Sequence, residues 1–168
     1  MQIRIYLAIT FVLCILSGCK QQKRPEGFPA LFPCTVTVTQ ENKPLEGASV
    51  RLLPESGSFE WIIAGTTDAS GTAKIFTHAD FAGAPAGTFK VLISKNEMEP
   101  SKLVQPKDKM SDEWKEWFAK WQEEKLATFR YVKPEYDNVK TTPHSITITK
   151  GNNKGTFDVG EAIQEEVK

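Results

Sequence analysis

Few residues of this 168-residue chain have the types and spacing that chemistry requires. His78 and His144 are far apart in the sequence, and neither belongs to a closely spaced histidine pair of the kind that binds zinc. Asp68 lies three positions before Gly71, but a calcium loop needs at least about six oxygen ligands, and TTDASG contains a single carboxylate. We therefore predict that Asp68 hydrogen-bonds to the backbone of a turn in which Gly71 has a positive φ.

Other catalytic arrangements are not indicated by any motif. The members of a Ser-His-Asp triad can come from anywhere in a fold, but no serine here has the Gly-x-Ser-x-Gly setting of a nucleophile elbow. Four carboxylates fall on the polar side of a predicted helix, where a solvated face is expected rather than acid/base catalysis: Glu113, Glu116, Glu123 and Glu124. The sequence thus predicts no enzyme, no catalytic residue, no metal site and no cofactor.

Three tryptophans are the strongest candidates for binding. The stretch SDEWKEWFAKWQEEKLATF predicts a helix over residues 111–127, with Ser111 as its N-cap. Its aromatic residues share one helical face: Trp114, Trp117, Phe118 and Trp121. Such a stripe either packs on the rest of the fold, which we expect, or is exposed and docks on a sugar ring or a partner groove. Membrane adsorption of this helix is disfavoured, because its polar face is as acidic as it is basic.

The first 19 residues, MQIRIYLAITFVLCILSGC, have the features of an export signal. Arg4 precedes an apolar run of about 12 residues, which is shorter than the roughly 20 residues of a transmembrane helix. The segment Leu16-Ser17-Gly18-Cys19 resembles the lipobox of bacterial lipoproteins. That resemblance implies removal of the signal peptide, residues 1–18, and lipidation of Cys19, with palmitate among the acyl chains.

A lipid bilayer is therefore the first expected partner. In bacterial lipoproteins an Asp after the cysteine favours the inner membrane, whereas Lys20 follows here, so we expect the outer membrane or the cell surface. Residues 19–33 contain three prolines and predict a stiff tether. Removal of residues 1–18 takes away Arg4 and leaves 20 basic against 21 acidic residues. Nucleic acid is accordingly not expected, and an envelope protein or a glycan remains the other class of partner.

From Cys34 onward apolar and polar residues alternate, the spacing that places one face of a strand on a core. The residues expected to point inward are Val36, Val38, Ala48, Val50, Leu52, Trp61, Ile63, Ala73, Ile75, Phe89, Val91, Ile93, Ile146, Ile148, Phe157 and Val159. Seven such segments predict an all-β, seven-stranded antiparallel sandwich over residues 34–160, with the helix inserted before a C-terminal hairpin and a tail at 161–168. Cys34 itself is expected to be a small buried hydrophobe.

Three stretches together resemble the carboxypeptidase regulatory-like, transthyretin-like domain: PLEGASV at 44–50, TTDASG at 66–71 and GAPAGTFKV at 83–91. Residues 131–159 resemble the closing half of bacterial envelope lipoproteins that are built on that domain. The resemblance covers residues 34–160 and implies a prealbumin-like Greek-key sandwich, commonly an accessory or binding module. Phe89 departs from the family pattern, which often has tyrosine there, and the tryptophan-rich helix lies in a region of variable length.

Two enzymes on the same fold class are not favoured. Iron dioxygenases of this class use two tyrosines and two histidines, and Tyr131, Tyr136, His78 and His144 supply those types at a spacing that does not fit. Transthyretin-like hydroxyisourate hydrolases end in Tyr-Arg-Gly-Ser, whereas this chain ends in EAIQEEVK. We therefore expect a lipid-anchored envelope protein with a non-catalytic binding or structural role. The alternative is an envelope carbohydrate-binding protein that uses the helix tryptophans, and a hydrolase of another kind is less expected.

Overall fold

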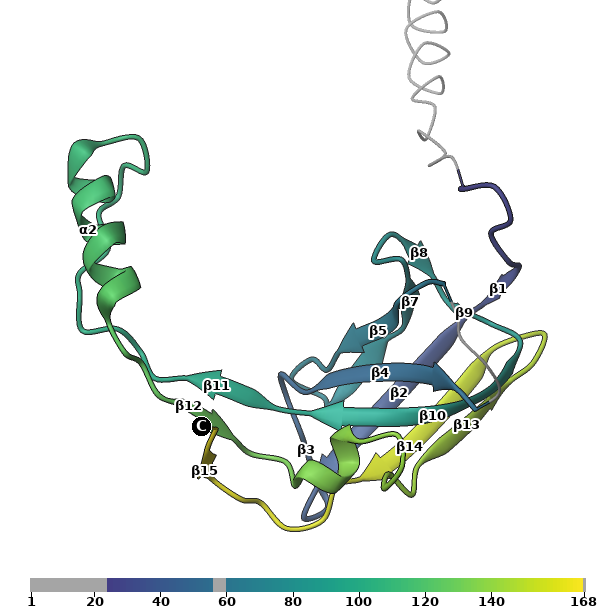
Figure 1. Cartoon of the computed structure of the whole chain (residues 1–168). Helices are drawn as coiled ribbons and strands as arrows, with labels where there is room; N and C mark the ends of the chain where they lie inside the picture. The colour runs from purple at the N-terminus through teal and green to yellow at the C-terminus, as the bar shows by residue number, and fades with distance from the viewer. Residues whose placement is uncertain (1–23, 56–59, 168) are drawn as a thin grey trace, which may run out of the picture.

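The computed structural model of the protein describes residues 24–55 and 60–167, which fold mostly into β-strands (Figure 1). These residues contain 15 strands, one α-helix and one 3-10 helix. The larger sheet has the order β13 (Ser145–Ile148), β10 (Gly87–Ser94), β4 (Ser49–Pro54), β5 (Ile63–Thr66), β7 (Phe76–Thr77) and β8 (Phe81–Ala82). The second sheet contains β14 (Asn153–Asp158), β2 (Cys34–Gln40) and β3 (Lys43–Pro44), and β6 (Thr72–Lys74) also pairs with β2.

The two sheets share one hydrophobic core, and the predicted alternation supplies it. Val36 in β2 is fully buried and belongs to the same cluster as Val50 in β4 and Val91 in β10. The register sets Val91 opposite Leu52, so that inward side chains of neighbouring strands meet. Of the residues expected to point inward, Trp61 and Phe157 are only half-buried and the others are buried. The prediction of an all-β fold is confirmed, and so is most of its core.

Cys34 lies at the head of β2 and is 4% exposed, as predicted. Burial raises the pKa of its thiol to about 11, so the side chain stays neutral and packs as a small hydrophobe.

The predicted C-terminal hairpin and the purely antiparallel pairing are wrong. Strand β13 pairs with β10 in the larger sheet, whereas β14 runs parallel to β2 in the second sheet. The side chain of Asn153 stabilises the crossing of the chain from one sheet to the other. Its amide nitrogen donates to the carbonyls of Thr149, Gly151 and Pro33 at 3.0–3.2 Å. Its carbonyl oxygen also accepts from the backbone N–H of Thr149 at 3.0 Å. The turn KGNNKG therefore joins two sheets rather than two neighbouring strands.

The predicted strand TAKIFT also divides between the sheets. Its first part, β6, pairs with β2, and its second part, β7, pairs with β5. Gly65 in β5 permits this crossing, because a Cβ at that position would lie only 2.4 Å from the carbonyl oxygen of Lys74. Short strands of this kind, rather than seven long ones, explain why the strand count exceeds the prediction.

The end of the predicted tether is part of the folded domain. Strand β1 (Leu31–Phe32) pairs with β9 (Ala84–Pro85), and the ring of Phe28 packs against Trp61 and Phe81 with centroids 5.3 and 4.6 Å away. Residues 1–18 and Cys19 lie outside the described residues.

The helix does not pack on the sandwich, which corrects the prediction for the tryptophan stripe. Strand β11 (Asn96–Met98) pairs with β12 (Thr128–Arg130), and β12 pairs with β15 (Glu165–Glu166) from the predicted tail. This small sheet continues from β10 and carries α2 (Asp112–Glu123) away from the core (Figure 1). We call residues 96–130 the arm.

Helix α2 begins as predicted and ends earlier. The hydroxyl of Ser111 accepts a hydrogen bond from the N–H of Trp114 at 3.1 Å, which is the N-cap geometry. The helix ends at Glu123 rather than at 127, because the apolar stripe has no member after Trp121 and β12 begins at Thr128. Among the described residues, no helix has the length and hydropathy that crossing a membrane requires.

Candidate functional site

The aromatic side chains of α2 pack mainly on one another. The rings of Trp114 and Trp117 are 4.9 Å apart, and those of Trp117 and Trp121 are 6.1 Å apart and stacked. Phe118 stacks on Trp121 at 5.8 Å, and no residue of the helix is buried. Each such aromatic pair contributes about 0.5–1.5 kcal/mol beyond its buried area, so the stack stabilises the helix without help from the sandwich.

Residues 99–111 fold back along α2 and complete the arm. The hydroxyl of Ser101 donates to the carboxylate of Glu124, and the N–H of Leu103 donates to the same hydroxyl at 3.1 Å. The ammonium of Lys109 lies 5.7 Å from the centre of the Trp114 ring, a cation-π contact. The arm is thus held by a few polar contacts and ring stacking, which is a small set of interactions for an element of this length.

The indole nitrogen of Trp117 is buried and has no hydrogen-bond partner, which distinguishes it from the other buried side-chain polar atoms of the described chain. A buried donor without an acceptor costs about 1–3 kcal/mol. The stripe is therefore not optimised for stability alone.

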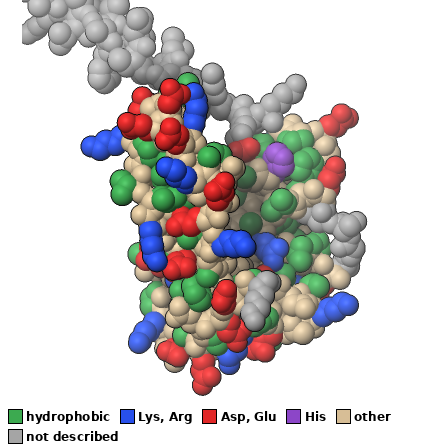
Figure 2. Space-filling model, turned by 60° about the vertical axis from the view of Figure 1, so that its left-hand side comes forward, with side chains coloured by type: hydrophobic (Ala, Val, Ile, Leu, Met, Phe, Trp, Pro, Cys, Tyr) green, Lys and Arg blue, Asp and Glu red, His purple; other side chains and the backbone are tan. Residues whose placement is uncertain are grey.

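Exposed apolar side chains are concentrated on the arm. Val104 is 90% exposed and Met110 is 88% exposed, while Met98 and Phe118 are about half exposed. Acidic and basic side chains are interspersed among green hydrophobic ones on the face shown in Figure 2, and that face is hollowed near its middle. Exposed apolar groups on a projecting element are typical of a contact surface.

A hollow of about 450 Å³ lies where α2 meets β12. It is lined by Met98, Trp121, Gln122, Glu124, Lys125 and Leu126. Trp121, one of the predicted binding residues, therefore borders a cavity.

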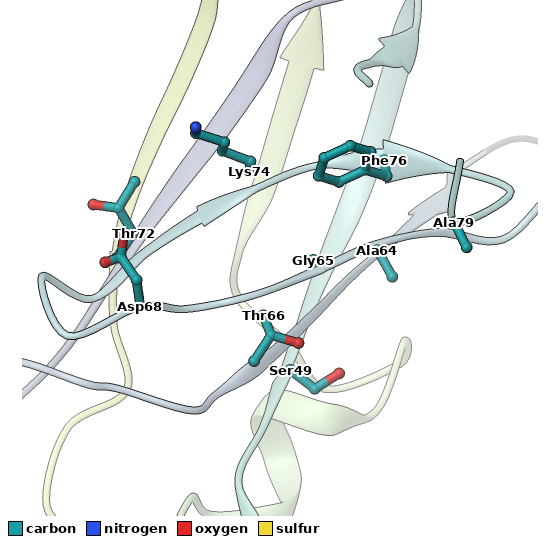
Figure 3. Close-up of a pocket in the computed structure, with 9 residues that line it drawn as sticks. All are labelled: Ser49, Ala64, Gly65, Thr66, Asp68, Thr72, Lys74, Phe76 and Ala79. Atoms are coloured by element: carbon teal, nitrogen blue, oxygen red, sulfur yellow. The ribbon is translucent and has the colours of Figure 1, made fainter. Parts of the chain in front are cut away.

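A second hollow, of about 550 Å³, lies on the sandwich near Asp68 (Figure 3). The figure shows the hydroxyls of Ser49 and Thr66 close together, with Lys74 pointing away from them. The carboxylate of Asp68 is used within its own turn. It accepts hydrogen bonds from the hydroxyl and N–H of Ser70 and from the N–H of Thr72. The hydroxyl of Ser70 in particular holds the pKa of Asp68 below its usual value. With Gly71 at φ +73°, the predicted turn is confirmed.

The two histidines occupy separate places. His78 has φ +56° and meets the ring of Trp61 edge-on at 5.3 Å, near β8. His144 lies between Tyr136 and Phe157, with ring centroids at 5.3 and 4.9 Å. Burial lowers the pKa of His144, which therefore stays neutral at pH 7.

The four residue types of an iron dioxygenase site are brought together only in part. Tyr136 and His144 stack, but the ring of Tyr131 instead lies 5.7 Å from the ammonium of Lys95, and His78 packs on Trp61. Within residues 24–55 and 60–167, no three His, Cys, Asp or Glu side chains are grouped for a metal.

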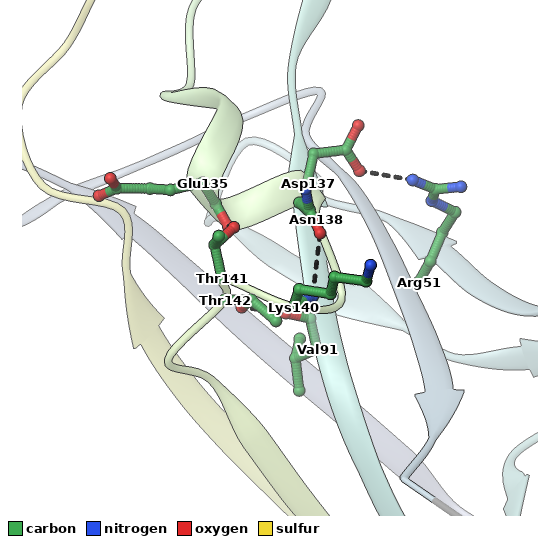
Figure 4. Close-up of polar contacts among 8 residues, drawn as sticks. All are labelled: Arg51, Val91, Glu135, Asp137, Asn138, Lys140, Thr141 and Thr142. Atoms are coloured by element: carbon green, nitrogen blue, oxygen red, sulfur yellow. Dashed lines mark hydrogen bonds and ion pairs between the residues drawn. The ribbon is translucent and has the colours of Figure 1, made fainter. Parts of the chain in front are cut away.

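The polar contacts around the 3-10 helix η2 (Pro134–Asp137) are structural (Figure 4). Arg51 from β4 donates to Asp137 at 2.5 Å, and the hydroxyl of Thr142 donates to the carbonyl of Val91 at 2.8 Å. The first bond ties η2, which lies against β10, to β4, and the second ties the segment after η2 to β10. Figure 4 shows the side chain of Glu135 pointing away from them.

Sequence reasoning found the tryptophans but missed the loop before them. Val104 and Met110 lie outside any periodic segment, so alternation and helical spacing say nothing of them. The signal in the sequence is composition: residues 100–110, PSKLVQPKDKM, combine three lysines and one aspartate with several apolar residues.

Comparisons of the chain with protein-family models, with curated proteins and with solved structures found no match. The resemblance to the carboxypeptidase regulatory-like domain therefore stays a prediction from the quoted motifs.

Proposed function

We propose that this chain is a lipid-anchored binding protein of a bacterial envelope, in which a non-catalytic, transthyretin-like sandwich carries the arm as its contact element. The observation that carries the proposal is the position of α2. An aromatic helix that stands apart from the core, with exposed apolar residues beside it, adds nothing to the sandwich core and has a surface suited to a partner.

The polar groups that chemistry would need are already occupied, which supports a non-catalytic role. The carboxylate of Asp68 accepts backbone hydrogen bonds within its turn, and the ring nitrogen Nε2 of His144 lies 3.1 Å from the carbonyl oxygen of Asp158. The thiol of Cys34 is buried and protonated. A catalytic site would instead bring a nucleophile and a base together in a cleft.

Carbohydrate binding is the second candidate, and the half-exposed tryptophans favour it. Sugar rings dock on flat aromatic faces, and Trp121 borders the hollow at the base of α2. Titration of the protein with envelope glycans tests this, because the fluorescence of a contacting tryptophan shifts or is quenched. A Trp121→Phe variant should lose most of that response, whereas Trp61→Phe, on the sandwich, should retain it.

The lipid anchor has its own test. Acylation at Cys19 predicts that the full chain, expressed in a bacterium, loses residues 1–18 and incorporates labelled palmitate. A Cys19→Ser variant should incorporate none and should leave the membrane fraction. Label that persists in that variant would contradict the anchor.

Photo-cross-linking on intact cells tests the contact role of the arm. A photoreactive residue at position 110 should give a defined adduct with an envelope component, and one at position 139, where Val139 is also exposed, should not. Equal adducts from both positions, or none from either, would contradict a binding role for the arm.

A further inference from the structure

The far end of the arm lies on the same side of the molecule as the beginning of the described chain. Because Met98 pairs with Thr128 at the base of the arm, the chain between them must turn at its other end. In Figure 1 this turn and the purple start of the described chain both project upward, while η2 lies on the lower side. One flat surface above the molecule would therefore approach both.

The tip of the arm exposes apolar surface next to lysines. Met110, directly before the N-cap Ser111, is 88% exposed there, and Val104 is 90% exposed farther along the same loop toward the base of the arm. Lys107 and Lys109 lie beside Asp108 in the loop and beside Asp112 and Glu113 in the first turn of α2, so the tip carries both signs of charge. Exposed apolar side chains favour the membrane-water boundary, where neighbouring lysines meet anionic headgroups.

The sandwich presents a second apolar patch next to the start of the chain. Phe28, Trp61 and Phe81 form an aromatic cluster, and Ile62 beside them is 74% exposed. Tryptophan and other aromatic residues prefer the membrane-water interface. Strand β8, which contains Phe81, is near the upper side of the molecule in Figure 1.

The position of the proposed anchor indicates that the partner of the arm tip is the bilayer. Cys19 is five residues before Arg24, and five residues span at most about 18 Å when fully extended. Acylation of Cys19 would therefore hold the upper side of the domain close to the membrane. Tethering raises the effective concentration of the arm tip at the surface, so that a weak contact suffices.

We propose that the tip of the arm, residues 106–110, is a second contact with the bilayer into which acylated Cys19 inserts. This inference rests on the proposed lipid anchor and names the partner of the arm. It makes the arm and the anchor two supports that fix the orientation of the sandwich above the membrane.

A fluorescent probe at position 110 tests the proposal in the full, acylated chain. We would place an environment-sensitive dye on Met110→Cys and, as the matched control, on Val139→Cys, which follows η2 on the opposite side. Cys34 is buried and protonated, so it does not compete for the label. The proteins are reconstituted into vesicles of phosphatidylglycerol and phosphatidylethanolamine, some of which contain a nitroxide lipid.

The expected result is a blue-shifted emission at position 110 that the nitroxide lipid quenches several-fold more than the emission at position 139. Lys107→Glu with Lys109→Glu should reduce that quenching several-fold in anionic vesicles, and the matched change Lys140→Glu with Lys154→Glu should not. Equal, water-like emission at both positions would overturn the proposal. So would a probe at 110 that responds to added envelope glycan or protein but not to lipid.

Failure of this inference and failure of the anchor are distinguishable. Flotation with the vesicles and the mass of the N-terminal peptide report on Cys19 alone. A chain that floats and is acylated, but whose position 110 stays in water, contradicts the arm contact only. A chain without acyl groups contradicts the anchor and, with it, the basis of the inference.

Discussion

The sandwich and the arm are stabilised in different ways. In the sandwich, side chains from both sheets meet in one core where Val36, Val50, Val91 and Ile93 are fully buried. In the arm, no residue of α2 is buried, and its rings stack on their own neighbours. The sandwich is built for stability, whereas the arm presents apolar surface to the outside.

This difference indicates a division of roles. A core buries its apolar area whatever the surroundings, because the hydrophobic effect acts within the molecule. The arm leaves Val104 and Met110 in water and one indole N–H without an acceptor. Both features cost free energy in the isolated protein and are relieved by a contact, which is why we place the binding role there.

The largest effect is expected from a core substitution. Leu52→Ala removes a side chain that is 2% exposed and should lower the free energy of unfolding by about 2–5 kcal/mol. Leu53→Ala is the matched control, because Leu53 is the next residue in β4 and is 40% exposed. Its cost should stay below about 1 kcal/mol. If both variants lost similar free energy of unfolding in urea denaturation, the alternation of buried and exposed residues along β4 would be contradicted.

A smaller loss is expected at Thr67, which is buried beside β5. Its hydroxyl accepts from the N–H of Ala48 at 2.8 Å and donates to the carbonyl of Leu45 at 2.5 Å. Thr67→Val keeps the shape and leaves both groups unpaired, at a cost of about 1–3 kcal/mol. Thr66→Val, at an exposed neighbouring position, should cost less than about 0.5 kcal/mol in the same denaturation assay. Equal losses of stability in Thr67→Val and Thr66→Val would mean that the hydroxyl of Thr67 does not stabilise the segment from Leu45 to Ala48.

The free energy of unfolding of the sandwich should also depend on pH. Burial between Tyr136 and Phe157 lowers the pKa of His144, so the unfolded chain binds its proton more readily than the folded chain. The resulting stability is fully present above the unfolded pKa of about 6.5 and is lost as pH falls through the lower folded pKa. Stability should thus decline from pH 7.5 to 5.5, and His144→Gln should reduce that slope. An unchanged slope would contradict the burial of His144.

The smallest effect on global stability is expected from the arm. Trp121→Ala removes the ring on which Trp117 and Phe118 stack, and α2 should lose helicity by circular dichroism. Because no residue of α2 is buried, the main unfolding transition should shift by less than about 0.5 kcal/mol. A shift as large as that of Leu52→Ala would show that the arm and the sandwich form one core.

Much of the sandwich could be predicted from the sequence because alternation is a local signal. Val36, Val50 and Val91 were expected to face inward, and they do. Sheet membership could not be predicted, because it depends on long-range pairing such as the parallel contact of β14 with β2. The turn at Asp68 was predictable, since an aspartate and a nearby glycine determine it locally.

The arm was predictable as a helix but not as an arm. The spacing of Trp114, Trp117 and Trp121 specifies a helical face and does not specify what covers that face. The pairing of β11 with β12 carries the helix away from the core, and these two strands have three residues each. Segments so short carry too little periodicity to be recognised.

Hydrogen exchange on the intact chain tests the separation of arm and sandwich most directly. The account predicts that amides of α2 exchange through local opening, at a free energy at least about 2 kcal/mol below that of β2 and β10. Added anionic vesicles should slow exchange in the arm and leave the sandwich unchanged. Exchange of α2 only together with β2 and β10, through global unfolding, would contradict the account.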